Sequence, residues 1–143
     1  MSEPRDATQL HGPKHVEAYL ETDGDVGHDW KNGTSTLILT TKGRKSGEPR
    51  ELPLIYGKSG DDYLIVASKG GADTPPAWYL NIEADPDVEL QVWDDRFPAK
   101  ARVATPEEKA EMWKTMTAEW PAYDDYQKKT DREIPIIVLE RKS

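Results

Sequence analysis

The chain has 143 residues, which is enough for one domain with its own core. It contains no cysteine, so disulfides, thiolate metal sites and cysteine nucleophiles are excluded, and its formal net charge of −8 argues against nonspecific binding to nucleic acid. No apolar run approaches the roughly 20 residues that a membrane-spanning helix needs, and we expect a cytoplasmic protein.

The N-terminal region is polar. Residues 1–14 contain two prolines and lack the hydrophobic segment of a signal peptide, so we expect a flexible arm there. Residues 15–20 predict a short helix, which the glycines within residues 23–27 would end. Residues 15–143 are expected to form a single domain.

Six segments have the β-branched enrichment or the period-two alternation that is typical of strands. They are residues 36–41, 50–56, 63–68, 88–93, 97–103 and 134–139. Pro53 has no backbone N–H, so the second segment is expected at a sheet edge or at a bulge. A hairpin signal at residues 59–62 leads into the third segment.

Two helices have start signals in the sequence. Thr74 and Pro75 predict an N-cap followed by proline at the first helical position, opening a helix that runs through Ile82. Thr105 and Glu108 have the spacing of a capping box, and their helix is expected to run to about residue 119.

The fold class follows from the order of these elements. Because turns of hairpin length join most of the six strands and helices are few, we expect a mainly β (α+β) fold, a small antiparallel barrel with flanking helices. The later strands do not alternate with crossover helices, which argues against a doubly wound sheet.

The turn between the first two strands is basic, whereas the chain as a whole is acidic. Residues 42–50 hold four cations and one carboxylate, although the whole chain has only 19 Lys and Arg against 27 Asp and Glu. Gly43 and Gly47 permit positive φ and a close approach of the backbone, so N–H groups and cations together could cradle a phosphate. A solvated hairpin whose cations keep the sheet edge soluble explains the pattern equally well.

Three further segments have both a functional and a structural interpretation. Residues 67–71 end a strand with a hydroxyl, a cation and two glycines, which suits an anion contact or a plain loop. Trp78 and Tyr79 can line a ligand or pack in the core, and Asn81 could read the edge of a heterocycle. Residues 120–127 mix aromatics, proline and acids, as in a lid over a flat ligand or a docked surface segment.

Other site chemistries lack a pattern in this sequence. His11, His15 and His28 do not have metal-ligand spacing, so no metal site is expected. The carboxylates suit a solvated surface better than a paired acid–base site, and no serine-centred nucleophile elbow occurs.

Four segments occur in an order and spacing that resemble a known family. They are residues 40–50, residues 67–71, residues 77–81 with Asp85 and Pro86, and residues 123–127 with residues 134–136. Together they look like the deazaflavin-dependent nitroreductase family of actinobacterial proteins, from about residue 35 to the C-terminus. The resemblance implies a split β-barrel, related to flavin-mononucleotide-binding oxidases, that holds coenzyme F-420.

The resemblance also implies an oxidoreductase. Such an enzyme transfers a hydride from reduced coenzyme F-420, an 8-hydroxy-5-deazaflavin, to an electron-poor small molecule such as a quinone or a nitroaromatic compound. The cofactor carries a phosphodiester and an oligoglutamate tail, which would account for a basic turn on an acidic chain. Carried over by position, the implied cofactor contacts are Arg44, Lys45, Ser46, Arg50, Glu51, Leu52, Pro53, Leu54, Ile55, Val66, Ala67, Ser68, Lys69, Ala77, Trp78, Tyr79, Leu80, Asn81 and Tyr123.

The substrate is less defined than the cofactor. The resemblance places Tyr123 on the substrate side of the ring, where it or Tyr126 could supply a proton. Family members that activate nitro drugs tend to have tyrosine where this chain has Ile55 and Trp120, which leaves the acceptor open. Two other interpretations remain, a cofactor carrier without turnover and a barrel that binds flavin mononucleotide or haem. A homodimer and a position peripheral to the inner face of the cell membrane are also compatible with the resemblance.

Overall fold

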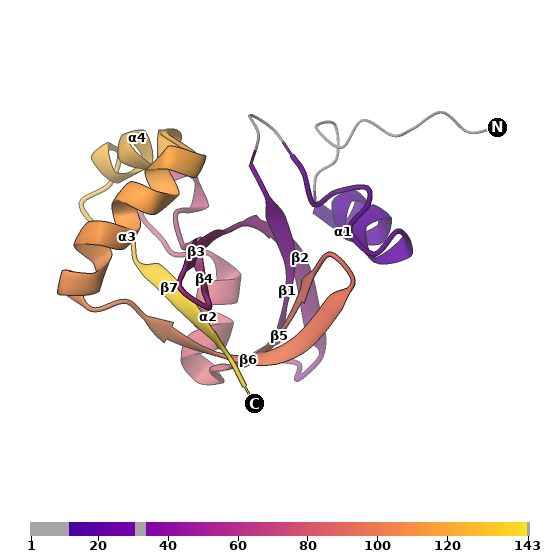
Figure 1. Cartoon of the computed structure of the whole chain (residues 1–143). Helices are drawn as coiled ribbons and strands as arrows, with labels where there is room; N and C mark the ends of the chain where they lie inside the picture. The colour runs from indigo at the N-terminus through magenta and orange to yellow at the C-terminus, as the bar shows by residue number, and fades with distance from the viewer. Residues whose placement is uncertain (1–11, 31–33, 143) are drawn as a thin grey trace.

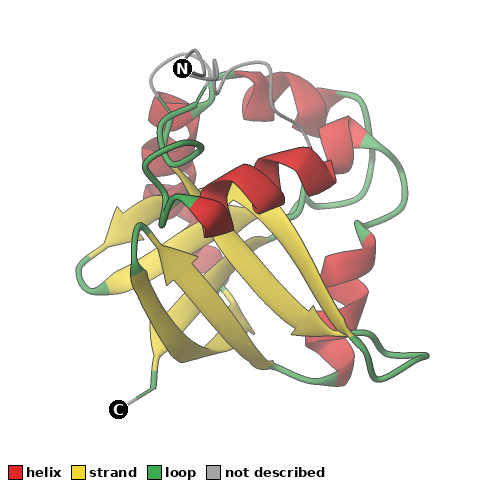
Figure 2. Ribbon diagram, turned by 90° about the vertical axis from the view of Figure 1, so that its right-hand side faces the viewer, coloured by secondary structure: helices red, strands yellow, loops and turns green. Residues whose placement is uncertain are grey.

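In the computed structural model of the protein, residues 12–30 and 34–142 are described, and they contain one antiparallel sheet. Its strand order is β2-β1-β5-β6-β7-β4-β3. The strands are β1 (Thr36–Lys42), β2 (Pro49–Ile55), β3 (Gly57–Ser59), β4 (Asp62–Val66), β5 (Asp87–Val92), β6 (Asp95–Val103) and β7 (Ile136–Arg141). The sheet curls into a half-barrel, which Figures 1 and 2 show from two directions.

Helices surround this half-barrel. Within the described ranges they are α1 (Gly12–Glu21), α2 (Ala77–Ala84), α3 (Pro106–Glu119) and α4 (Ala122–Lys128), with a 3-10 turn at Lys69–Gly71. α1 packs against β2 on one side, whereas α3 packs on β3, β4 and β7 on the other side, with α4 beside it (Figure 1).

Apolar clusters on the two faces of the sheet hold the fold together. The larger cluster is enclosed by the curl of the sheet, where Trp78 of α2 meets strand residues such as Leu37 and Leu90. A second cluster fills the space between the sheet and the helices α3 and α4, with Met116 fully buried in it. Residues 136–139 of β7 contribute alternately to both clusters, which explains their uninterrupted apolar run.

The six expected strands are all present, with bounds within two residues of the prediction. A seventh strand, β3, was not predicted, because the hairpin signal obscured a strand only three residues long. β2 pairs only with β1 and lies at the edge of the sheet, so the position expected from Pro53 is confirmed.

One helix begins later than predicted, and another was not predicted. The helix expected from Thr74 begins at Ala77, and its N-cap residue Pro76 makes no side-chain cap hydrogen bond. The N-cap prediction for Thr74 is therefore wrong: consecutive prolines keep the chain extended before the helix, and the Thr74 hydroxyl accepts a hydrogen bond from Lys69 Nζ at 3.4 Å. Residues 122–128 form α4, where only a lid or a docked segment was expected.

The start of α1 changes the description of the N-terminal arm. α1 begins at Gly12, so residues 12–14 of the expected arm are helical. The rest of that prediction, residues 1–11, lies outside the described residues.

The capping box at the start of α3 is confirmed. Glu108 N donates to Thr105 Oγ1 at 3.2 Å, and Thr105 N donates to the Glu108 carboxylate at 2.9 Å. Arg102 donates two more hydrogen bonds to that carboxylate, at 2.7 and 2.8 Å. The Arg102 guanidinium is the main reason why the pKa of Glu108 falls to about 2.

We expect Thr105→Ala to lower the free energy of unfolding by about 1 kcal/mol, because the Glu108 N–H loses its acceptor. Thr117→Ala is the matched control in the same helix, since the Thr117 hydroxyl donates only to Lys114 O one turn earlier and alanine favours helices. Urea unfolding of the two variants measures the difference, and equal losses of stability would contradict the capping role.

Candidate functional site

Two adjoining cavities lie between β2, the loop after β4 and the start of α2. The larger one, of about 650 Å³, we call the basic cavity. Its lining consists of Gly43, Arg44, Lys45, Ser46, Arg50, Glu51, Leu52, Lys69, Pro76, Ala77, Trp78 and Asn81. The smaller one, of about 300 Å³, we call the aromatic cavity. Its lining consists of Trp30, Pro53, Leu54, Ile55, Val66, Ser68, Lys69, Pro76, Trp78, Trp120, Tyr123 and Tyr126.

The turn between β1 and β2 forms one wall of the basic cavity. Gly43 N donates to Glu48 O at 2.8 Å, Gly47 N donates to Gly43 O at 2.8 Å, and Gly47 has a φ of +75° that favours glycine. Glu48 N donates to Ser46 Oγ at 3.1 Å. Because the N–H groups of Gly43, Gly47 and Glu48 already have partners inside the turn, they would not form the backbone cradle that the sequence suggested.

Asn81 joins this turn to α2. Its Oδ1 accepts from Arg44 N at 3.2 Å and from Arg44 Nη1 at 3.0 Å, and its Nδ2 donates to Thr41 Oγ1 at 3.1 Å. Asn81 is buried and both ends of its amide have partners, so it fixes the wall of the cavity. Because Nδ2 has a second hydrogen, the reading of a heterocycle edge by Asn81 stays a prediction.

The cations of the basic cavity face solvent. Arg44, Lys45 and Arg50 are exposed, and none of the ion pairs found within the described ranges involves them. Ala77 begins α2 in the same wall, where the first N–H groups of a helix add partial positive charge. The cavity therefore has the chemistry to bind an anion.

The aromatic cavity has flat, mainly apolar walls. Trp30 and Trp120 stack with their ring centroids 6.1 Å apart, and Trp120 Nε1 donates to the Tyr126 hydroxyl at 3.2 Å. Tyr123 meets the ring of Tyr126 edge-on. Burial raises the pKa of the Tyr123 hydroxyl above its usual range, so this phenol stays protonated and can donate a hydrogen bond to a ligand.

The cavities adjoin because Lys69, Pro76 and Trp78 line both of them. Trp78 is also buried in the cluster enclosed by the sheet, so the wall common to both cavities is anchored in the core. The arrangement can hold one elongated ligand that has an anionic end and a flat end.

Most of the residues implied as cofactor contacts line one of the two cavities, and Tyr126 lines the aromatic one. The exceptions are Ala67, Tyr79 and Leu80. Ala67 is fully buried in the core, and Leu80 is half-buried on α2. Tyr79 lines a separate cavity of about 450 Å³ together with Arg132.

Trp30 and Pro76 line the site but were not predicted. Pro76 immediately precedes the predicted contact Ala77, so its position at the start of α2 was a signal that it lines the site. Trp30 has no local signal, because it reaches the site through the segment between α1 and β1, where Asp29 and Ser35 form an isolated bridge.

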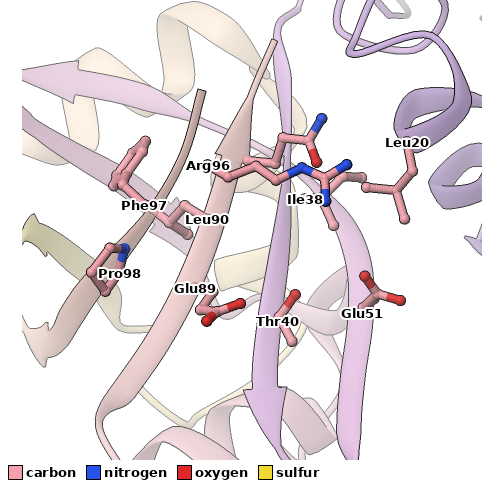
Figure 3. Close-up of a pocket in the computed structure, with 10 residues that line it drawn as sticks. Leu20, Ile38, Thr40, Glu51, Glu89, Leu90, Arg96, Phe97 and Pro98 are labelled. Atoms are coloured by element: carbon pink, nitrogen blue, oxygen red, sulfur yellow. The ribbon is translucent and has the colours of Figure 1, made fainter. Parts of the chain in front are cut away.

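A fourth pocket lies on the outer face of the sheet, where Leu20 of α1 contributes to its lining (Figure 3). Glu51, Thr40 and Glu89 occupy neighbouring register positions on β2, β1 and β5, with Arg96 nearby. Its volume of about 180 Å³ is smaller than most ligand sites, and we assign it no function. Among the described residues there is no group of three His, Cys, Asp or Glu side chains that could hold a metal ion, and no helix long and apolar enough to cross a membrane.

Comparison with known proteins decides the family. Residues 13–141 match a family model described as F420H(2)-dependent quinone reductase. The chain belongs to this family. A quinone reductase of this name from Mycobacterium tuberculosis (strain H37Rv) is 40% identical over 131 residues, which cover 90% of this chain and 88% of the relative.

Solved structures support the same assignment. One described as an F420-H2 dependent reductase (FDR-A) is 40% identical, with a TM-score of 0.69, and the match covers 73% of this chain and 93% of that chain. Another, described as a domain-swapped dimer, is 39% identical with a TM-score of 0.72, covering 87% and 93%. A putative pyridoxamine 5'-phosphate oxidase from Listeria innocua, at 12% identity and a TM-score of 0.54 over 90% and 91% of the two chains, shows the fold alone.

These comparisons confirm the expected family, the split-barrel fold class and an oxidoreductase family that depends on coenzyme F-420. The resemblance implied a quinone or a nitroaromatic acceptor, and of these two classes the family description names the quinone.

Tyr123 generates a prediction about alkaline pH. Burial raises its pKa above the ordinary value of 10.0, so above pH 10 the unfolded chain loses a proton that the native state keeps. Stability therefore falls as the pH rises through this range, and we expect Tyr123→Phe to make that fall less steep. Urea unfolding at about pH 8 and at several values above pH 10 measures it, and parallel curves for the two proteins would contradict the prediction.

Proposed function

We propose that this chain binds reduced coenzyme F-420 and transfers a hydride from it to a quinone. The observation that carries the proposal is the pair of adjoining cavities, one cationic and one aromatic, with Trp78 between them. A cofactor with an anionic tail and a flat ring needs these two environments side by side. Family membership supports the same cofactor and the same acceptor class.

The residues of the basic cavity fit the anionic part of the cofactor. Lys45 and Arg50 would hold phosphate and carboxylate groups, since both are exposed on the wall and neither has an ion pair within the described ranges. Arg44 would contribute charge from a fixed place, because Asn81 and Ala77 O accept from its guanidinium.

The residues of the aromatic cavity fit the ring and the acceptor. Reduced coenzyme F-420 supplies a hydride when it is bound. The chain's own contribution is to orient the two reactants and to keep water away from them, for which Trp30, Trp78 and Trp120 provide the apolar surface. Tyr123 would donate a hydrogen bond to an oxygen of the quinone, because its raised pKa keeps the proton on the phenol.

We expect the double variant Lys45→Ala/Arg50→Ala to weaken binding of coenzyme F-420 by up to about 30-fold, since each exposed ionic contact contributes up to about 1 kcal/mol. The loss should be larger at low salt, where charges are least screened. Fluorescence titration measures the affinity. Lys58→Ala/Lys114→Ala removes two exposed cations outside both cavities and is the matched control. Equal affinities in the two double variants would refute the tail assignment.

Turnover separates an enzyme from a cofactor carrier. The protein loaded with reduced coenzyme F-420 is mixed with menadione, and the absorbance of the oxidised cofactor is followed. We expect oxidation faster than in a protein-free solution of the same reactants. An unchanged rate would favour the carrier, and tighter binding of flavin mononucleotide or haem in parallel titrations would favour those ligands.

We also propose a homodimer that works in the cytoplasm at the inner face of the membrane. The support for the dimer is the relative described as a domain-swapped dimer. The support for the location is the acceptor class, because many quinones dissolve in lipid. Light scattering tests the dimer, and co-sedimentation with lipid vesicles tests the membrane contact.

A further inference from the structure

We propose that Arg132 is a positioning residue for the cofactor site. Arg132 lies in the link between α4 and β7 and lines neither the basic nor the aromatic cavity. Its guanidinium holds the loop of residues 67–72, and this loop carries Lys69 to both cavities. The holding of the loop by Arg132 is argued from hydrogen bonds alone. The effect of Arg132 on cofactor affinity rests on the proposed function.

Three carbonyl oxygens of the loop accept hydrogen bonds from this one side chain. Arg132 Nε donates to Ala72 O at 2.8 Å, and Nη2 donates to Ser68 O at 2.9 Å and to Ala67 O at 3.2 Å. The guanidinium therefore joins the first residues of the loop to its last one. Although Asp131 and Glu133 flank it in sequence, no ion pair found within the described ranges includes Arg132.

The loop needs such a clamp because its backbone is unusual. Lys69 has a φ of +46° and Gly71 a φ of +86°, and residues with a side chain rarely adopt the first value. A loop of this shape does not persist unless its surroundings hold it. Lys69 can therefore stay on the wall common to both cavities only while the carbonyl groups around it are fixed.

Arginine suits this position better than lysine. The guanidinium presents five N–H donors in a rigid planar fork, so two nitrogens can reach carbonyls at opposite ends of the loop. A lysine ammonium is a single point on a flexible stem and cannot span the same three oxygens in a fixed geometry.

The clamp also joins the loop to the acceptor side of the site. Thr130 Oγ1 donates to Asp73 Oδ1 at 2.7 Å, and Gln127 Nε2 donates to Arg132 O at 2.8 Å. Gly71 lies so close to α4 that a Cβ there would come within 2.7 Å of Tyr126 O. Lys69 and the tyrosines of α4 are thus positioned as one unit.

Arg132→Gln tests the clamp, with Arg102→Gln as the matched control. Arg102 donates two hydrogen bonds to Glu108 at the start of α3, and it lines neither cavity. Hydrogen exchange of the peptide over residues 67–73 is measured first, in the protein without cofactor. We expect faster exchange in Arg132→Gln than in the wild type, and exchange at the wild-type rate in Arg102→Gln.

Affinity and turnover are measured next on the same proteins. We expect Arg132→Gln to raise the Kd for coenzyme F-420 about tenfold, in line with the loss of charged hydrogen bonds, and to lower kcat for menadione more than it raises KM. Arg102→Gln should lower Tm and leave both the Kd and the ratio of kcat to KM near the wild-type values.

The outcomes are distinguishable. If the wild type does not bind coenzyme F-420, the proposed function fails. The hydrogen-exchange measurement still tests whether Arg132 holds the loop of residues 67–72. Exchange at the wild-type rate in Arg132→Gln, or equal changes in both variants, would overturn the clamp. If Arg132→Gln does not fold by circular dichroism, Arg132→Lys replaces it with an intermediate effect expected, and wild-type exchange in that variant would overturn the role of the fork.

Discussion

The burial of Trp78 is the constraint on which the rest of the site depends. Its ring belongs to the cluster enclosed by the sheet, so its position is fixed by the packing of strands from most of the sheet. The same ring forms the wall where the two cavities adjoin. A cleft whose central wall is part of the core keeps its shape without a ligand, which reduces the ordering that binding requires.

Charge and aromatic surface divide the cleft into two parts with separate tasks. The chain is acidic overall, yet Arg44, Lys45 and Arg50 line the basic cavity, whereas Tyr123 lines the aromatic one. Binding energy from anionic groups remote from the reacting ring can then hold the ring in place. Among the described residues that line the aromatic cavity, Lys69 is the one cation, and this lining suits a flat and weakly polar acceptor.

Sequence alone predicted the strands and the start of α3 because those signals are local, whereas the cofactor contacts came from the family resemblance and stay a prediction. Pro53 placed β2 at an edge, Thr105 and Glu108 marked the start of α3, and the glycines of the β1–β2 turn marked a bend. Three features could not be read this way. Ser59 ends a strand too short to show periodicity, and Trp30 reaches the site through tertiary packing.

The third feature is the difference between the two faces of α2. Trp78 and Tyr79 are adjacent in the sequence and alike in chemistry, yet about 100° of helical rotation separates them. Trp78 enters the core and the cleft, whereas Tyr79 turns to a separate cavity beside Arg132. Asn81, three residues after Trp78, returns to the same face and bonds to the basic turn. An eight-residue helix is too short for its apolar pattern to reveal this division.

The edge position of β2 has a consequence for how copies of the chain can meet. An exposed edge strand offers its backbone to a strand from another molecule, and such pairing is a common route to aggregation. Pro53 removes one donor from this row, and Glu51 adds an exposed charge beside it. Because β2 is also a wall of the cleft, a feature that discourages edge-to-edge pairing keeps the entrance to the site clear of neighbouring molecules.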